Sequence, residues 1–533
     1  MTEPHDLYSQ LAFSASKTPK NTALVCSHKK WSYHRLLHCC DRAADMFWSL
    51  GIRKEDRVVI ALKNSPEFII THFALAKLGA VSVPVNFMVS KEEELGFIVG
   101  NCHAKGVVTQ KDFITPYLHL QKKLPALNFI ISTDHAAHNG HILDFSHLLK
   151  TSHSHAETQK ANAGPADAAS ILYTSGTTGH PKGVILTHGN LLANARSCAH
   201  AMHLTKKDAF LCILPMFHTF SWTTTVMAPL LLGSKILIAP QIVPAKPWLS
   251  EMGKEGVTVM AAVPQLFSVL AKEARGLKKF YLRYWPFRKM RFCFSGAAPL
   301  SASIKHLFEK NFGIPLLEGY GLTETSPVVS VNRPHSRKHG SVGQPIPGVT
   351  VRIIDDLGCE LSSGEEGEIC VKGPNVTRGY HSNPAATVEI FTPDGWLKTG
   401  DIGVMDEDGF LFIRDRKKDM IIVKGLKVFP AQLEMVLHEH PGVAETAVIG
   451  VPDPNGDELI KCFCVARPGH VLDKAEIMSF LRQKLDPYKR PREIELVESL
   501  PKNALQKVLK RVLRQKEIEK RAAAAADRMQ VIA

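Results

Sequence analysis

Long hydrophobic runs are missing from this sequence of 533 residues. A membrane-spanning helix needs roughly 20 consecutive apolar residues, and no uninterrupted run in the chain approaches that length. The first residues, MTEPHDLYSQLAF, contain neither the basic start nor the apolar core of a secretion signal. We therefore expect the protein to stay in the cytoplasm.

Cysteine pairs of the metal-binding kind are missing too. The eleven cysteines are scattered, and no C-x-x-C pair occurs. Cys462 and Cys464 lie in IKCFCVA, where strict alternation puts both side chains on one face of a strand. We predict that these residues are buried thiols and that the chain has no cysteine metal site.

Acidic residues are outnumbered, since 51 Asp and Glu stand against 65 Lys and Arg for a formal charge of +14. Such an excess favours anionic partners, namely nucleotides, CoA, an acidic carrier protein or a lipid surface. We expect no nucleic-acid partner. The segment 274–291, ARGLKKFYLRYWPFRKMR, holds seven Lys or Arg, five aromatics and no acid. It suits the inner face of a membrane, and its alternative is a solvated helix face and loop.

The chain is too long for a single core and predicts two or more domains. Before residue 414, short apolar runs such as RVVIALKN alternate with helix-like segments, which indicates mostly parallel sheets covered by helices. From about residue 340, short strands and Asp-Gly turns indicate a β-rich subdomain. We predict an α/β fold with a large body over residues 1–414 and a small mobile α+β domain over 415–533.

A loop rich in Gly, Ser and Thr follows the apolar run ASILY. It is not a P-loop, which needs Gly, four residues and then Gly-Lys-Ser/Thr. Its glycines let backbone N–H groups approach an anion, and its hydroxyls and lysine add donors and charge. The alternative is a plain turn. The candidate phosphate-binding residues are Thr174, Ser175, Gly176, Thr177, Thr178, Gly179 and Lys182.

Seven motifs along the chain resemble, in order and spacing, the acyl- and aryl-CoA synthetase family of adenylate-forming enzymes, and bacterial long-chain fatty acyl-CoA ligases most of all. They are YTSGTTGHPKGVILTHGN (173–190), LPMFHTF (214–220), FSGAAPLS (294–301), EGYGLTETSP (318–327), GWLKTGDIG (395–403), DRKKDMIIVKGLKVFPAQLE (415–434) and LPKNALQKVLKR (500–511). The resemblance implies that a carboxylate attacks the α-phosphate of Mg-ATP and expels pyrophosphate. The thiol of CoA then displaces AMP.

For EGYGLTETSP, the resemblance implies that Tyr320 lies against the adenine, Thr323 binds the α-phosphate and Glu324 binds Mg²⁺, for which a carboxylate is a suitable hard ligand. A Gly-Tyr-Gly turn with a helix N-cap at Thr323 is the alternative. The same motif supplies three further candidate nucleotide-binding residues, Glu318, Gly319 and Gly321.

Two other motifs are implied to hold the nucleoside. Asp401 would accept both ribose hydroxyls, and Arg416 would reinforce the sugar contact. By residue type alone, Asp401 could equally be a turn residue. The small residues Gly296, Ala297 and Ala298 would form one wall of the adenine pocket.

The resemblance makes Lys507 the adenylation lysine, whose ammonium would bridge the carboxylate and the α-phosphate as negative charge develops. The alternative is a solvated lysine in a cationic stretch. The chain departs from the family at Gln506, where glycine is usual. Lys418 would be the hinge, about which the small domain rotates to remove Lys507 and to bring Gly425 to the thiol tunnel.

The acid-free segment 214–232, LPMFHTFSWTTTVMAPLLL, predicts the acyl pocket. An amino-acid substrate would bury an ammonium that nothing there balances, whereas Trp222 and the leucines suit an alkyl chain. His218 would stand between the acyl pocket and the thiol, although a satisfied core histidine is its common alternative. Two other hypotheses remain: an acyl carrier protein as the thiol acceptor, and a lipid- or membrane-binding homologue with weakened catalysis.

Overall fold

The structure is a computed structural model, and its two compact units are described separately. Unit 1 comprises residues 1–351 with 371–397, and unit 2 comprises residues 352–370 with 398–533. The described residues are 4–134, 142–153, 158, 163–174, 181–423, 426–452, 458–502 and 507–532. The predicted α/β fold class is confirmed. The boundary at residue 415 falls inside unit 2 and stays a prediction.

Unit 1 contains a seven-stranded sheet that is parallel except for its last pair, β8 and β9. In spatial order the strands are β7 (Leu143–Asp144), β6 (Phe129–Ser132), β5 (Ala104–Thr109), β3 (Arg57–Ala61), β4 (Val81–Pro84), β8 (Ala168–Thr174) and β9 (Lys182–Thr187). Four of the five residues of β3 are buried. Such uninterrupted burial is typical of parallel strands covered on both faces.

The second sheet of unit 1 has nine strands, and its central strands are parallel. Its order is β16 (Gln344–Pro345), β15 (Val328–Val331), β14 (Leu316–Gly321), β13 (Phe292–Ser295), β12 (Val259–Ala262), β10 (Ala209–Cys212), β11 (Lys235–Ile238), β1 (Thr22–Cys26) and β2 (Lys29–Ser32). One large core joins the two sheets, because Ile60 of β3 and Ile236 of β11 belong to the same buried cluster.

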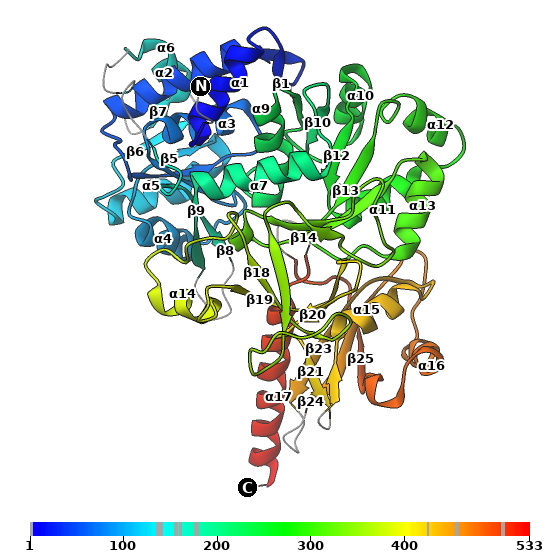
Figure 1. Ribbon diagram of the computed structural model, residues 1–533. Helices are drawn as coiled ribbons and strands as arrows, with labels where there is room; N and C mark the ends of the chain where they lie inside the picture. The colour runs from blue at the N-terminus through cyan, green and yellow to red at the C-terminus, as the bar shows by residue number, and fades with distance from the viewer. Residues whose placement is uncertain are drawn as a thin grey trace. The chain divides into compact units, whose positions relative to one another are not determined.

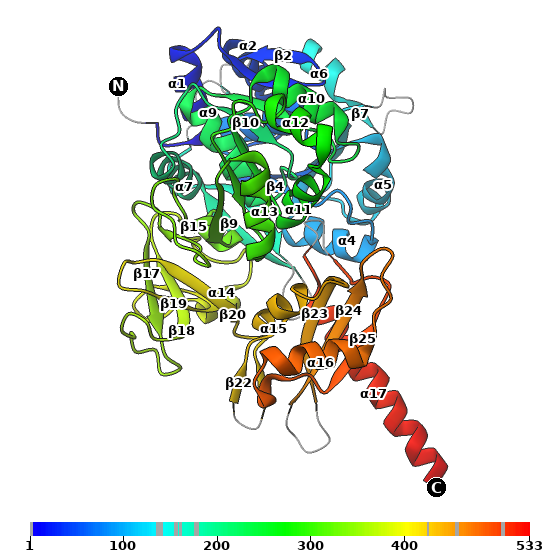
Figure 2. The ribbon, with the colours of Figure 1, turned by 90° about the vertical axis from the view of Figure 1, so that its right-hand side faces the viewer.

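Helices surround both sheets of unit 1 (Figures 1 and 2). They are α1 (Leu7–Lys17), α2 (Tyr33–Ser49), α3 (Pro66–Lys77), α4 (Glu92–Asn101), η1 (Lys111–Phe113), α5 (Ile114–Lys123), α6 (Phe145–Thr151), α7 (His188–Ala201), α8 (Thr219–Ser221), η3 (Trp222–Met227), α9 (Ala228–Leu232), α10 (Lys246–Glu255), α11 (Pro264–Glu273), α12 (Gly276–Tyr284), α13 (Ala302–Phe312), η4 (Thr323–Thr325) and α14 (Pro384–Ile390). Helix α7 begins with a capping box, in which Thr187 and Asn190 satisfy each other's backbone N–H groups.

Unit 2 combines three small sheets with helices. Its elements are the sheet of β17 (Thr350–Ile354), β18 (Gly367–Lys372), β19 (Leu397–Met405) and β20 (Leu411–Arg416), the pair β21 (Ile421–Val423) and β22 (Leu426–Val428), the sheet of β23 (Val443–Pro452), β24 (Glu458–Ala466) and β25 (Glu493–Leu496), and the helices α15 (Pro430–His438), α16 (Lys474–Lys484), η5 (Pro487–Lys489) and α17 (Lys510–Ile532). Cys462 and Cys464 both lie in its core, as their alternation predicted. The turn after β19 contains Gly409, whose φ of 76° explains the glycine.

Among the described residues, no helix is long and apolar enough to cross a membrane.

Candidate functional site

Strands β8 and β9 bracket the predicted phosphate loop in unit 1. Thr174 pairs with Lys182 across the two antiparallel strands, and its hydroxyl donates to the Lys182 carbonyl over 3.4 Å. The remaining candidates of the loop lie outside the described residues: Ser175, Gly176, Thr177, Thr178 and Gly179. The structure therefore defines where the loop leaves one strand and enters the next.

Tyr380 joins two candidate residues that are distant in sequence. The Lys182 ammonium lies 5.2 Å from the centroid of the Tyr380 ring, which is a cation–π distance. The Tyr380 hydroxyl donates to Oε1 of Glu324 at 2.8 Å. The tyrosine is itself positioned by a backbone bridge to Val184. One aromatic side chain thus connects the cation predicted for phosphate with the carboxylate predicted for Mg²⁺.

No signal in the sequence marks Tyr380. It is 56 residues from Glu324 along the chain, and no local pattern marks a tyrosine after Thr-Arg-Gly as a partner of a remote carboxylate. The contact depends on the tertiary fold.

The turn that carries Glu324 is fixed by two buried asparagines. Asn194 of α7 donates to the carbonyls of Thr325 and Val328 at 3.3 and 2.7 Å. Asn375 donates to the same two carbonyls at 2.8 and 3.1 Å. Moving this turn would break several buried hydrogen bonds, each expensive to leave unmade. The Glu324 backbone is therefore held in place before any ligand binds.

Close packing around the same turn explains Gly321. A Cβ atom at this position would lie 2.0 Å from the carbonyl oxygen of Pro327, so only glycine fits. The short helix η4 starts at Thr323, but the hydroxyl that accepts from the Leu322 N–H belongs to Thr325. Thr323 is therefore not the helix N-cap that the alternative interpretation required.

Strand β14 carries the other candidates of this motif. Tyr320 pairs with Ser330 of β15. Glu318 forms an ion pair of 3.1 Å with Lys305 of α13, and burial raises the pKa of Glu318 against the opposing effect of Lys305. A Cβ atom at Gly319 would approach the Ser330 carbonyl oxygen to 3.1 Å. Glu318 thus has a structural partner, and Gly319 permits close strand pairing.

The motifs SGAAPLS and LPMFHTF lie side by side. A Cβ atom at Gly296 would come within 2.9 Å of the Phe220 ring, so the glycine makes room for that ring. Ala297 has a φ of 69°, a left-handed conformation that is uncommon for alanine and often marks functional sites. Ala298 follows it directly in the chain. His218 caps α8, because its Nδ1 accepts the Phe220 N–H at 3.2 Å.

The predicted acyl segment forms α8, the π-helix η3 and α9. Trp222 at its centre is 4% exposed, and its ring centroid lies 4.2 Å from that of His72. Desolvation lowers the pKa of His72 to about 3, so this histidine is neutral at physiological pH. The surroundings of Trp222 are therefore apolar or uncharged. Trp222 also begins the π-helix η3, and short π-helical stretches are frequent at functional sites.

In unit 2, Asp401 and Arg416 face each other. They are register partners across β19 and β20, and the Arg416 Nε lies 2.6 Å from the Asp401 Oδ1. The Asp401 side chain is 4% exposed, whereas that of Arg416 is 37% exposed. Asp401 lies inside a strand, so the alternative of a turn residue is wrong. The predicted ribose pair is assembled by the pairing of these two strands.

Lys507 lies near the same pair. Its pKa is lowered, first by desolvation and then by the Arg416 cation, while Asp401 and Asp419 act in the opposite direction. Because the residue keeps an exposed surface, this desolvation is partial. Lys418 also lowers the Lys507 pKa, and its own pKa is lowered by burial.

The structure thus brings Asp401, Arg416, Lys418 and Lys507 within electrostatic range of one another in unit 2. Gly425 and Gln506 lie outside the described residues.

A buried charged cluster holds the start of α17, three residues after Lys507. The Lys510 ammonium lies 2.8 Å from Oε1 of Glu434, which also accepts the Val448 N–H at 2.8 Å. Desolvation opposes the charge of Lys510, but Glu434 and Asp415 outweigh it and raise the Lys510 pKa. Burial raises the pKa of both carboxyls. In the sequence, Lys510 looks like one more solvated lysine of a cationic stretch.

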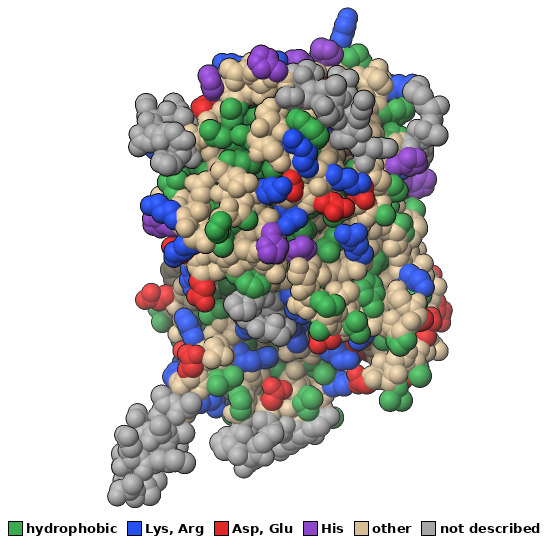
Figure 3. All heavy atoms as spheres, turned by 90° about the vertical axis from the view of Figure 1, so that its left-hand side faces the viewer, with side chains coloured by type: hydrophobic (Ala, Val, Ile, Leu, Met, Phe, Trp, Pro, Cys, Tyr) green, Lys and Arg blue, Asp and Glu red, His purple; other side chains and the backbone are tan. Residues whose placement is uncertain are grey.

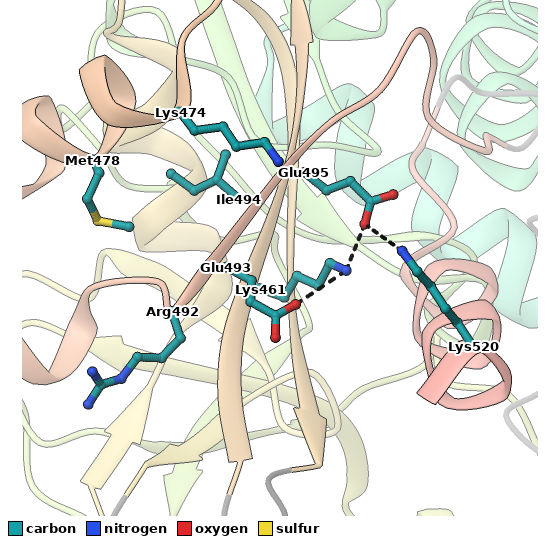
Figure 4. A pocket seen from close by; sticks show the side chains of 8 residues that line it. All are labelled: Lys461, Lys474, Met478, Arg492, Glu493, Ile494, Glu495 and Lys520. Carbon is teal, nitrogen blue, oxygen red and sulfur yellow. Dashed lines mark ion pairs between the residues drawn. The ribbon is translucent and has the colours of Figure 1, made fainter. Parts of the chain in front are cut away.

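A cavity of about 530 Å³ in unit 2 contains none of the predicted site residues (Figure 4). Lys461, one of the residues that line it, is 4% exposed and pairs with Glu495 and Glu517, each at 2.7 Å. Lys520 of α17 also reaches Glu495 at 3.5 Å. These charges neutralise one another and connect α17 to the sheet, so we assign the cluster a structural role.

Comparison with known proteins identifies the family. The family model described as AMP-binding enzyme matches residues 11–381, and that of the AMP-binding enzyme C-terminal domain matches residues 432–507.

Individual proteins match over nearly the full length. A long-chain-fatty-acid–CoA ligase of Bacillus subtilis is 34% identical, over 96% of this chain and 95% of that protein. A crotonobetaine/carnitine–CoA ligase of Escherichia coli is 33% identical, over 92% and 96%. The crystal structure of an anthranilate CoA ligase in complex with anthranoyl-AMP superposes with a TM-score of 0.87 at 25% identity, over 99% of both chains. The chain therefore belongs to the AMP-binding enzyme family, that is, to the adenylate-forming acyl- and aryl-CoA synthetases.

Proposed function

We propose that this protein activates medium- or long-chain fatty acids in two steps. In the first, a carboxylate oxygen of the acid attacks the α-phosphorus of ATP, the bond to the β-phosphate oxygen breaks, and pyrophosphate leaves. In the second, the thiol of CoA loses its proton and attacks the acyl carbon, and AMP leaves. The products are acyl-CoA, AMP and pyrophosphate.

One observation supports a fatty acid in particular: the segment 214–232 is acid-free, and the ionisable residue packed on Trp222 is a neutral histidine. A substrate with a quaternary or primary ammonium would need a carboxylate to balance its charge. An alkyl chain needs only apolar contact, and each buried CH₂ contributes about 0.8 kcal/mol.

In unit 1, we assign the phosphates to the loop between β8 and β9, to Lys182 and to Thr323, and Mg²⁺ to Glu324. No group of three or more His, Cys, Asp or Glu side chains in the described part of the chain could hold a metal by itself. That fits Mg²⁺, which usually binds one or two carboxylates together with substrate phosphates. The ion would neutralise phosphate charge, and Tyr380 orients the Glu324 carboxylate that would hold it.

In the same unit, the adenine is assigned to Tyr320 and to the wall formed by Gly296, Ala297 and Ala298. The close approach of Phe220 to Gly296 supports a pocket shaped by flat rings. His218 is assigned to the boundary between the acyl group and the thiol. Because its Nδ1 accepts a backbone N–H, Nε2 would carry the proton of a neutral His218 ring.

In unit 2, we assign the ribose hydroxyls to Asp401 and Arg416. Lys507 is the cation that stabilises negative charge as it develops on the α-phosphate, which is the kind of contact that accelerates a reaction. Its nearness to the ribose pair supports this role. Lys418 is assigned to the hinge, and Gly425 to the thiol tunnel.

The substrate proposal is tested by measuring AMP formation with straight-chain acids of increasing length. If the pocket is apolar, kcat/KM should rise about fourfold per added CH₂ until the pocket is full, as expected from 0.8 kcal/mol per methylene. Benzoate and carnitine should be poor substrates. A preference for either, or a rate independent of chain length, would contradict the fatty-acid assignment.

The thiol acceptor is tested with preformed acyl-AMP. We expect the acyl-AMP to be consumed when CoA is added. If the phosphopantetheine of an acyl carrier protein consumes it faster, the carrier protein and not CoA is the acceptor. Pyrophosphate release that depends on added fatty acid would exclude a lipid-binding homologue with weakened catalysis.

A further inference from the structure

Helix α12 of unit 1 turns its apolar side outward. Leu277, Phe280, Tyr281 and Tyr284 follow the spacing i, i+3, i+4, i+7, which places them on one face of a helix. Their exposed fractions are 89%, 62%, 48% and 62%, respectively. Trp285, directly after the helix, is 40% exposed and continues the row. We call these five residues the outer stripe.

Surface helices normally direct such a row toward the core. In α12, the buried residue is Leu282 on the other side. The rings of Phe280 and Tyr284 stack on each other with centroids 6.1 Å apart and planes 18° apart, so these two residues form one joined aromatic surface within the outer stripe. Contiguous exposed apolar patches of this kind usually mark binding surfaces.

The charged residues within segment 274–291 are all of one sign, because it has seven basic residues and no acid. In the described structure, three of the seven form an ion pair or a hydrogen bond through their side chains. Lys278 pairs with Glu273, Arg288 donates to the Gly253 carbonyl, and Arg291 pairs with Asp208. In the described part of the chain, no ion pair involves the other four: Arg275, Lys279, Arg283 and Lys289.

We propose that α12 docks this protein on an anionic lipid surface. The aromatic outer stripe enters the boundary between headgroups and acyl chains. Arg275, Lys279 and Arg283 lie on the other sides of the same helix, and because a helix is about as wide as a Debye length, their charges still attract the anionic surface. Figure 1 shows α12 at the edge of unit 1, in agreement with the exposure of its outer stripe. On the side of the molecule drawn in Figure 3, basic and acidic side chains are interspersed instead. The inference is independent of which acid the enzyme activates.

The experiment is flotation of the full-length protein with lipid vesicles. One set of vesicles contains phosphatidylcholine alone, and the other also contains anionic phosphatidylglycerol. We expect binding to the anionic vesicles, little binding to the neutral ones, and a decrease in the bound fraction as salt rises, because salt screens the basic residues.

Two variants separate the apolar and ionic contributions. Changing Leu277, Phe280 and Tyr284 to Ser should abolish flotation with either kind of vesicle. Changing Arg275, Lys279 and Arg283 to Gln should weaken the partition coefficient about 100-fold, since each basic residue near an anionic surface contributes about fivefold. Arg288 stays unchanged in both, because its bonds to Gly253 hold the fold.

A matched control changes three apolar residues elsewhere that are at least as exposed, Leu357, Val388 and Val471, to Ser. It should float like the wild type, and thermal melting should show that all variants are folded. The proposal is overturned if wild-type protein does not bind anionic vesicles, or if the control loses binding as much as the stripe variant. It is also overturned if the stripe variant still floats with anionic vesicles and has lost only self-association or binding to an acidic protein.

Discussion

At the scale of single residues, Tyr380 links Lys182 to Glu324, and its two interactions can be separated by substitution. Tyr380→Phe keeps the ring under the lysine but removes the hydrogen bond to Glu324. A hydrogen bond to a charged group contributes about 1.5–3 kcal/mol. We therefore expect kcat/KM for Mg-ATP to fall roughly 10- to 100-fold.

Tyr8 provides the control for this prediction, because its hydroxyl donates to Asp41 and Lys77 lies 5.0 Å from its ring centroid. Tyr8→Phe removes the same kind of bond away from the predicted phosphate site. Its steady-state kinetics should match those of the wild type. Equal losses of kcat/KM in both variants would show that the Tyr380 bond matters only for stability.

A second prediction at this scale concerns pH. Desolvation lowers the pKa of His72 to about 3 in the folded protein, whereas an unfolded histidine has a pKa of about 6.5. Above pH 6.5, both states are neutral and His72 adds no pH dependence. Below it, the unfolded state binds the proton first, so folding stability decreases as pH falls. At about pH 5, the expected loss is about 2 kcal/mol.

His72→Leu should remove this loss, and should not weaken the protein at neutral pH, because neither ring nitrogen of His72 has a hydrogen-bond partner in the described structure. Urea unfolding of both proteins between about pH 5 and 7.5 measures the difference. Parallel pH profiles for the variant and the wild type would contradict the buried, neutral state of His72.

At the scale of secondary-structure elements, the start of α17 depends on the charged cluster of Lys510, Glu434 and Asp415. Lys510→Met leaves two carboxylates buried without a cation, and breaking a buried pair in this way costs about 3–5 kcal/mol. Lys516, exposed on the same helix, provides the control. Lys516→Met should change the free energy of unfolding little, and an equally small effect of Lys510→Met would contradict the importance of the cluster.

The sequence predicted individual strands and helices better than any other feature of the structure. Strands β3, β11 and β13 follow from short apolar runs, and β24 follows from the alternation around Cys462 and Cys464. Local patterns report burial and period, which are properties of a short segment. They carry no signal for the order of strands in a sheet, for the π-helical form of η3, or for Asn375 bonding to the turn at Thr325.

At the scale of the whole molecule, the seven motifs predicted the family, which the comparisons confirmed over both matched domains. The structure pairs Asp401 with Arg416 and puts Lys507 within electrostatic range of them, while the roles of these residues stay predictions. The sequence did not predict the contacts of Tyr380 and Lys510, because each residue contacts a partner far away in the chain. A pattern of neighbouring residues cannot report such a contact.

The central claim is that Lys507 serves the adenylation step, and separate measurement of the two half-reactions with palmitate tests it most directly. Deleting a single donor to the transition state usually slows a reaction roughly 100- to 1000-fold, so Lys507→Ala should slow palmitoyl-AMP formation by about that factor. The same variant should convert preformed palmitoyl-AMP and CoA to palmitoyl-CoA at close to the wild-type rate, and the exposed-lysine variant Lys516→Ala should retain both steps. Equal loss of both half-reactions in a folded Lys507→Ala protein, or ADP instead of AMP as the product of the wild type, would contradict the account.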